Sequence, residues 1–195
     1  MESVLRNDIV EGNRTISNLA KLLCIPYKTR IVSQIIFQQV YPKLFKKESY
    51  NVVALVCVYL ASKINETLIK LDVILEAMAK AAHMSTAPSR ERIIAIECKV
   101  IELIEFQFNI SPVQFFLLRL GKTLNIDVLK KLSVLDEIHG DGRVNFIKYF
   151  GGVYEPEMVA LSVLDEEELS LFECFFGVSV NRALVEEIKS VVIKK

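Results

Sequence analysis

The feature that most restricts the fold is an unbroken run of ten apolar or small residues, Val52–Ala61, which is followed by the charged residues Lys63 and Glu66. The run is shorter than the roughly 20 apolar residues that a membrane-spanning helix needs. Valine and tyrosine also favour strands, but apolar and polar residues do not alternate here, so a helix is the better interpretation. A helix that is apolar on every side lies inside a bundle. The run therefore predicts a buried central helix whose charged end emerges from the core.

The composition indicates a globular protein with a large core. Hydrophobic residues make up 52% of the chain, and the mean hydropathy is +0.35, so either most helices are deeply buried or an apolar surface is kept for a partner. Lysine plus arginine equals aspartate plus glutamate, 24 against 24, which argues against a strongly electrostatic nucleic-acid binder. The N-terminal sequence lacks the apolar stretch of a signal peptide. The cysteines are widely spaced, which predicts reduced core thiols, not a disulfide or zinc framework, at Cys24, Cys57, Cys98 and Cys174.

Apolar residues recur at helical spacing in five segments of the first half of the chain. The expected helices cover residues 13–23, 27–44, 48–66, 71–82 and 89–106, with a loop at 84–89. In the second helix Gln34, Gln38 and Gln39 lie opposite the apolar stripe, which predicts a solvent-facing side. In the fourth, Glu76 and Lys80 are four residues apart and are expected to pair on the outer face. Ser89 is expected to cap the fifth.

The second half repeats this plan in shorter form. Helices are expected from 112, from 128 to 150 with a break at 139–142, from 156, from 169 to 177 and from 179 to 193. Ser111 and Ser179 are the expected caps of the first and last of them. The triplet Val53-Ala54-Leu55 recurs as Val159-Ala160-Leu161, each time within an apolar segment. Two similar five-helix units, the second abbreviated, follow from this pattern.

Two charged residues occupy apolar stripes. Glu97 lies among the apolar residues of the fifth expected helix, and Lys63 lies on the apolar side of the central one. A charge in such a position is costly unless it is paired. We therefore expect Lys63 and Glu97 to meet. Two interpretations remain open: a structural ion pair at the rim of the bundle, or a pair that also offers a donor and an acceptor to a partner.

Four segments resemble the cyclin family. Leu60–Glu66 (LASKINE) resembles the LAxKxxE segment of the cyclin box. Ile96–Phe108 is similar to the family's hydrophobic-Glu segment and to the L-x-F-x-hydrophobic end of its fifth helix. Ser111–Phe116 (SPVQFF) resembles the entry into the second box, and Tyr154–Ala160 (YEPEMVA) resembles the P-x-x-hydrophobic-A start of its central helix. The resemblance extends over nearly the whole chain.

The resemblance implies an all-α fold of two tandem five-helix cyclin boxes, residues 12–109 and 110–195, the second shortened. It implies a non-catalytic regulatory subunit that binds and activates a cyclin-dependent kinase, with a third assembly subunit as a further candidate partner. In the family, the matching lysine and glutamate bind the kinase near its regulatory C-helix, which gives Lys63 and Glu97 that role here. The other interface positions implied by the resemblance are Ile64, Glu66, Ile101, Phe106 and Phe108. The family also implies a nuclear location, with the cytoplasm as an alternative.

Some family features are not found in the sequence. It has no tryptophan, no M-R-x-I-L segment and no R-x-x-L destruction-box pattern near the N-terminus, so it looks more like the transcription-type cyclins of the cyclin-H group. An alternative is a cyclin-fold module that resembles the core of transcription factor IIB and binds DNA or protein without a kinase. That module would require a basic face and usually a zinc ribbon, and neither is apparent. A helical enzyme would require a polar constellation that the sequence does not show.

No motif for catalysis, cofactor binding or metal binding is evident. His83 and His139 are isolated from cysteines and carboxylates that could complete a metal or nucleophile site. Asp136, Glu137 and Asp141 lack the spacing of a calcium-binding loop. We therefore expect no catalytic residues, no cofactor, no metal ion, and no direct contact with nucleic acid or membrane.

Overall fold

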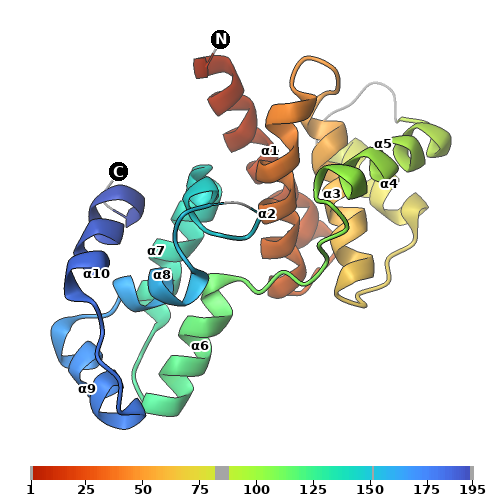
Figure 1. Cartoon of the computed structure of the whole chain (residues 1–195). Coiled ribbons are helices and arrows are strands. Elements are labelled where there is room, and N and C mark those ends of the chain that lie inside the picture. Colours follow the sequence, from red (N-terminus) through yellow and green to blue (C-terminus); the bar gives the residue numbers. More distant parts are fainter. Residues whose placement is uncertain (1, 82–87, 151, 194–195) are drawn as a thin grey trace. The chain divides into compact units, whose positions relative to one another are not determined.

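The computed structural model describes residues 2–81, 88–150 and 152–193, and its regular elements in these ranges are all helical (Figure 1). The expected all-α fold class is confirmed. The chain divides into two compact units, residues 1–110 with 139–142 and residues 111–138 with 143–195. The helices in the first are α1 (Glu2–Leu22), α2 (Tyr27–Leu44), α3 (Tyr50–Ile64), α4 (Leu71–Ala81) and α5 (Arg90–Leu103). Those of the second are α6 (Val113–Leu124), α7 (Leu129–Gly140), η1 (Arg143–Phe146), α8 (Pro156–Ser162), α9 (Glu166–Phe176), α10 (Arg182–Ile188) and η2 (Lys189–Ile193).

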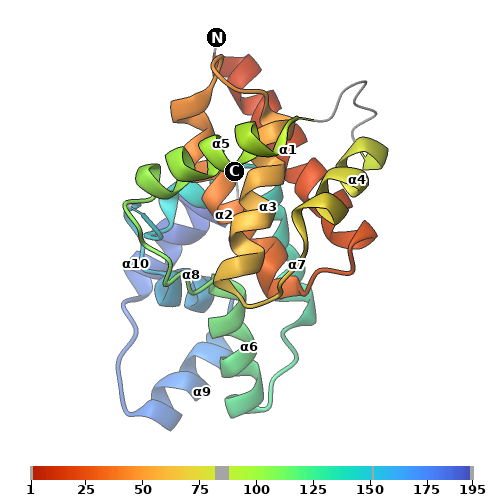
Figure 2. The same ribbon diagram turned by 90° about the vertical axis from the view of Figure 1, so that its right-hand side faces the viewer.

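The predicted central helix is α3. It packs against α1, α2, α4 and α5, and it lies among these helices in Figure 2. All ten residues of Val52–Ala61 except Tyr59 are buried. Burying apolar surface stabilises a fold by about 25 cal/mol per Å², so the apolar run places the core of this unit. The competing interpretation as a strand was wrong.

Helix α2 has the predicted range, but the predicted solvent face was wrong. Gln34 and Gln38 are buried, because their Nε2 groups find acceptors inside the unit. The Gln38 Nε2 group donates to Asn13 Oδ1 at 3.2 Å and to the His139 carbonyl at 2.6 Å. The Gln34 Nε2 group donates to Ser17 Oγ at 3.3 Å. Buried amides are tolerated when they are hydrogen-bonded in this way.

Helix α1 begins far earlier than the sequence suggested. It starts at Glu2 and runs through Asn13, where the sequence predicted a helix start. Gly12 lies where α1 crosses Phe37 of α2, and a Cβ there would come within 2.0 Å of the Phe37 ring. Asn13 is buried and donates to the His139 and Gly140 carbonyls at 3.0 and 3.2 Å. Close packing thus accounts for Gly12, and buried hydrogen bonds within the unit account for Asn13.

The second unit is built around a much shorter central helix. Helix α8 has seven residues, and Val159, Ala160 and Leu161 are buried in it. It packs against α6 and α10. The backbone N–H of Val113 donates a hydrogen bond to Tyr149 Oη at 3.0 Å. Burial raises the pKa of the Tyr149 phenol. The repeated triplet therefore occupies the core in both units.

Several local predictions need correction. Ser111 does not cap α6, since Pro112 is the residue before the helix and makes no side-chain cap. Asn181 caps α10 in place of Ser179, with Oδ1 accepting from Leu184 N at 3.1 Å. The Ser89 cap on α5 and the Glu76–Lys80 pair are confirmed, as is the break near 139–142. The expected loop at 84–89 lies mostly outside the described residues.

The cysteine prediction was half right. All four thiols are unpaired, but Cys57 alone is buried, and Cys24, Cys98 and Cys174 are exposed. Burial raises the pKa of the Cys57 thiol well above its ordinary value, so this cysteine serves as a small core residue of α3.

Candidate functional site

The predicted ion pair forms. Lys63 lies in the last turn of α3 and Glu97 in the middle of α5, and Lys63 Nζ contacts Glu97 Oε1. The Glu97 side chain is 9% exposed and that of Lys63 is 41% exposed. The carboxylate is therefore held inside the unit, while the ammonium remains in reach of solvent or of a partner.

The ammonium of Lys63 has a second neighbour. It lies 4.3 Å from the centre of the Tyr59 ring, one turn earlier in α3. A cation over an aromatic face gains about 0.5–1 kcal/mol at an exposed site. Tyr59 was not among the predicted site residues, although its spacing of four residues from Lys63 on one helix could have indicated it.

An apolar surface surrounds Glu97 on α5. Ile101, one turn after Glu97, is half-buried, and Ile94, Ala95 and Cys98 are exposed. The exposure of Ile94 depends on how many helices pack against α5, which sequence spacing alone does not give. Ile94, Cys98 and Ile101 thus form a partly exposed apolar stripe beside Glu97.

Two aromatic side chains follow α5. Phe106 is 66% exposed and Phe108 is 40% exposed, and their rings meet edge to face at 6.4 Å. The helix ends at Leu103, not at Phe106 as predicted, and Glu105 and Phe106 have φ of +53° and +58°. Left-handed backbone is unfavourable for residues other than glycine. This strained turn leaves the large apolar side chain of Phe106 mostly exposed to solvent.

The remaining predicted residues lie at the end of α3. Ile64 is its last residue and half-buried, and Glu66 follows in an exposed position with φ of +55°. The structure thus pairs Lys63 with Glu97 and Phe106 with Phe108, and it places Ile64, Glu66 and Ile101 on the same two segments. That these residues bind a partner remains a prediction.

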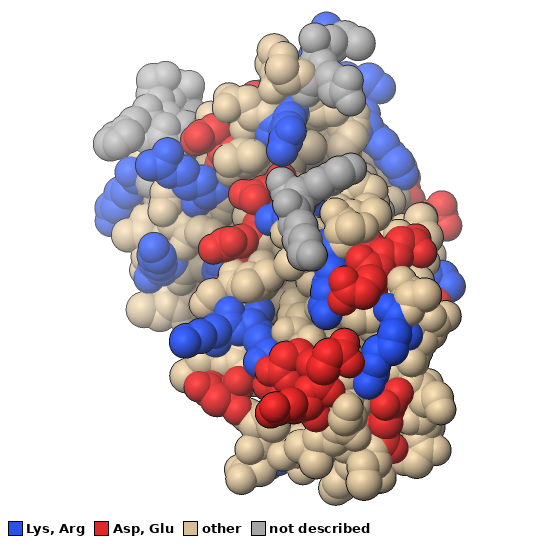
Figure 3. Space-filling model, turned by 90° about the vertical axis from the view of Figure 1, so that its left-hand side faces the viewer, with Lys and Arg blue, Asp and Glu red and all other residues tan. Residues whose placement is uncertain are grey.

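Other classes of site find little support in the described residues. There is no group of three or more His, Cys, Asp and Glu side chains that could hold a metal ion within the described ranges. His139 is buried near the end of α7, and His83 lies outside the described residues. No described helix is both long and apolar enough to cross a bilayer. On the face shown in Figure 3, basic and acidic side chains are interspersed.

Comparisons with known proteins give a likeness of fold. No protein-family model and no curated protein sequence matches the chain. Its structure is similar to that of a chain in the crystal structure of the yeast RNA Pol II CTD kinase CTDK-1 complex, with a TM-score of 0.68. The likeness covers 97% of this chain and 77% of the yeast chain, at 16% sequence identity. At that identity, the comparison establishes a shared all-helical fold.

Proposed function

We propose that this protein is a regulatory cyclin that binds and activates a cyclin-dependent protein kinase of the transcription-associated type. In this proposal residues 12–109 and 110–195 are tandem cyclin boxes, the chain itself is not catalytic, and it acts in the nucleus. The observation that carries the proposal is the Lys63–Glu97 pair within the apolar surface of α3 and α5.

The geometry of that pair suits a protein partner. Glu97 is almost fully buried, yet it is held by a lysine whose side chain is 41% exposed. A partner that covers this surface would desolvate the pair and strengthen every hydrogen bond to it. The exposed side chains of Ile94, Phe106 and Phe108 would supply apolar area around it. Specific interfaces have this arrangement, with apolar residues supplying area and charged groups fixing the register.

In the proposed mechanism, this protein holds the regulatory helix of the kinase in its active position. A kinase is competent when the glutamate of its regulatory helix meets the lysine that binds ATP. A rigid surface that grips this helix through an ion pair and an apolar patch shifts the kinase toward that arrangement. The pair at the end of α3 is suited to this, because α3 itself is fixed on all sides by the first unit.

The fold comparison supports the same partner class. The similar yeast chain belongs to a complex described as an RNA Pol II CTD kinase. That description favours a kinase partner and a role in transcription over one in the cell cycle. The balanced charge of the chain, 24 basic against 24 acidic residues, does not favour the alternative of a DNA-binding module.

The test is affinity purification of the tagged full chain from native cells, followed by mass spectrometry and a kinase assay on an RNA polymerase II CTD peptide. We expect a kinase catalytic subunit with the wild-type chain and at least about 30-fold weaker binding with Lys63→Ala or Glu97→Ala, because truncating one member of a desolvated pair costs about 2–5 kcal/mol. The matched control is Glu76→Ala, which breaks the exposed Glu76–Lys80 pair of α4. Recovery of promoter DNA without any kinase would contradict the proposal.

A charge swap separates the two interpretations of the pair. The double variant Lys63→Glu, Glu97→Lys restores an internal ion pair with reversed polarity. If the kinase contacts Lys63 and Glu97 directly, the swap recovers the thermal stability that the single variants lose, but it does not recover kinase binding. If it recovers both, the pair is structural only, and the proposed interface is wrong.

A further inference from the structure

The second unit contains an open apolar groove that the proposed kinase surface does not use. It has a volume of about 490 Å³ and lies between α6, α8 and α9. Its apolar lining consists of Phe116, Leu120, Leu161, Phe172, Phe176 and Val178. Phe176 and Val178 are 45% and 49% exposed, so the groove opens to solvent.

Aromatic side chains gather at the open end of the groove. The Phe176 ring lies 4.8 Å from that of Phe172 and 5.0 Å from that of Phe175, which is also exposed. Leu171, Phe175, Phe176 and Val178 are all exposed within eight residues. Scattered exposed apolar residues are ordinary, but a contiguous group next to a groove marks an interaction site.

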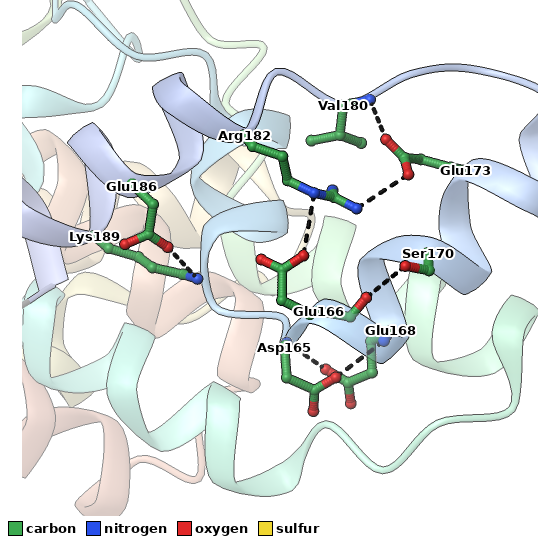
Figure 4. Close-up of polar contacts among 9 residues, drawn as sticks. All are labelled: Asp165, Glu166, Glu168, Ser170, Glu173, Val180, Arg182, Glu186 and Lys189. Carbon is green, nitrogen blue, oxygen red and sulfur yellow. Dashed lines mark hydrogen bonds and ion pairs between the residues drawn. The ribbon is translucent and has the colours of Figure 1, made fainter.

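The wall of the groove is fixed before anything binds. Gly177 ends α9 with φ of +65°, which turns the chain so that Val178 faces the groove. Beyond the turn, the backbone N–H of Val180 donates to Glu173 Oε1 at 2.6 Å. Arg182 then pairs with Glu173 at 3.0 Å and with Glu166 at 3.2 Å (Figure 4). These bonds tie the segment after α9 back to α9 itself, so little ordering entropy would be lost on binding.

Two charged side chains border the apolar lining. Arg119 of α6 and Glu157 of α8 both line the groove and are exposed. Neither forms a hydrogen bond or an ion pair with another residue in the described part of the chain. A ligand with an acidic group near Arg119 and a basic group near Glu157 would satisfy both.

We propose that this groove binds an amphipathic helix of a partner protein. Its apolar residues, spaced at i, i+3 or i+4 and i+7, would pack on the aromatic lining, with an acidic residue against Arg119 and a basic one against Glu157. A helix fits better than an extended peptide, because the described part of the second unit offers only the isolated Ile147–Tyr154 bridge and no strand edge for an added strand.

The experiment uses the full chain and a display library of randomised 16-residue helix-forming peptides. Enriched peptides are expected to share the apolar spacing and an acidic residue, and to gain helical circular dichroism on binding. By fluorescence polarisation, Phe176→Ser should weaken their binding at least tenfold and Arg119→Glu about fivefold. Changing the acidic residue of the peptide to lysine should recover binding to the Arg119→Glu variant. Arg119 is exposed, so this second variant does not depend on an intact core.

The matched control is Leu129→Ser, which changes an exposed leucine of α7 that does not line the groove. It should leave peptide binding unchanged. No enrichment, or binding that is insensitive to both groove variants, would overturn the proposal. So would self-association of the wild-type chain in sedimentation equilibrium that Phe176→Ser abolishes, because a second copy would then occupy the groove. None of these outcomes depends on whether Lys63 and Glu97 bind a kinase.

Discussion

The two units bury the same triplet but expose different chemistry. In the first, Val53-Ala54-Leu55 lies in a 15-residue helix that contacts four others and carries Lys63 in its last turn. In the second, Val159-Ala160-Leu161 lies in a seven-residue helix that is followed at once by the acidic start of α9. The long helix can carry a charged side chain from the core to the surface, where it meets Glu97. The short one cannot, and the exposed surface beside it is an apolar groove.

The apolar triplet therefore determines only which segment of each unit is buried. What each unit can bind depends on the residues just beyond the triplet, and on whether a neighbouring helix supplies a counter-charge. Matched substitutions at the central alanine, at a helix glycine and at a helix cap of each unit should therefore have unequal effects.

The largest expected difference concerns the alanine at the centre of each triplet. Ala54→Leu and Ala160→Leu each add bulk at a position with no exposed surface. Overpacking costs about 1–3 kcal/mol, and we expect the upper value for Ala54, since α3 is enclosed by four helices. For Ala160 we expect about 1 kcal/mol, because the shorter α8 can shift. Amide hydrogen exchange, read separately over α3 and α8, checks this.

Equal loss of protection at the two sites would show that α8 is as tightly enclosed as α3. Ala79→Leu on the exposed side of α4 is the control, and it should leave exchange over both helices unchanged.

Two helix glycines give the next comparison. A Cβ at Gly12 would lie 2.0 Å from the buried Phe37 ring, whereas one at Gly121 would lie 2.9 Å from a methyl group of Val128. Gly12→Ala should destabilise the first unit by about 2 kcal/mol, because the ring has no space to move. For Gly121→Ala we expect about 1 kcal/mol, because crowding against both Val128 methyl groups and the Ile126 carbonyl oxygen, at 2.9, 3.0 and 3.2 Å, is partly offset by the helix preference of alanine. Urea unfolding followed by unit-specific hydrogen exchange measures both.

Gly140→Ala is the control, because nothing lies within 4 Å of a Cβ there. If Gly12→Ala proved as mild as Gly140→Ala, α1 would not cross Phe37 as closely as the structure has it.

The sequence predicted what depends on neighbours along the chain. The range of α2, the cap at Ser89 and the central position of α3 all follow from local spacing. The Lys63–Glu97 pair was predictable too, because two opposite charges on apolar stripes have few other solutions. The burial of Gln38 was not, since one of its partners, the His139 carbonyl, is 101 residues away. The predicted helix start at Asn13 was wrong for the same reason, because Asn13 donates to the His139 carbonyl, 126 residues away.

The groove in the second unit was beyond sequence reasoning. In the sequence, Arg119 and Glu157 resemble ordinary surface charges. The apolar segment with Phe172, Phe175 and Phe176 resembles a buried helix. What makes the groove is the turn at Gly177 and the bonds of Arg182 to α9. Those contacts combine residues whose spacing carries no recognisable pattern.

The smallest effects are expected at the helix caps. Ser89 caps α5 by accepting a bond from Arg92 N at 3.3 Å, and Asp165 caps α9 by accepting one from Glu168 N at 3.0 Å. The Glu168 carboxylate in turn accepts a bond from the backbone N–H of Asp165. Replacing a cap by alanine costs about 0.5–2 kcal/mol. We expect Asp165→Ala to cost about 1 kcal/mol and Ser89→Ala about half of that, because the charged acceptor bonds more strongly. Hydrogen exchange over α9 and α5 measures each.

The Asp165 cap should also be sensitive to acid. The bond from the Glu168 backbone holds the pKa of the Asp165 carboxyl below its ordinary value. A carboxyl whose folded-state pKa is lowered contributes stability above its ordinary pKa of about 3.9, and that stability is lost as the pH falls through the lowered value. The informative comparison is with Asp165→Asn, which keeps an acceptor but cannot be protonated. Between pH 5 and pH 3, protection of α9 should fall more steeply in the wild type than in Asp165→Asn. Identical slopes would mean that protonation of Asp165 does not govern the acid response of this helix.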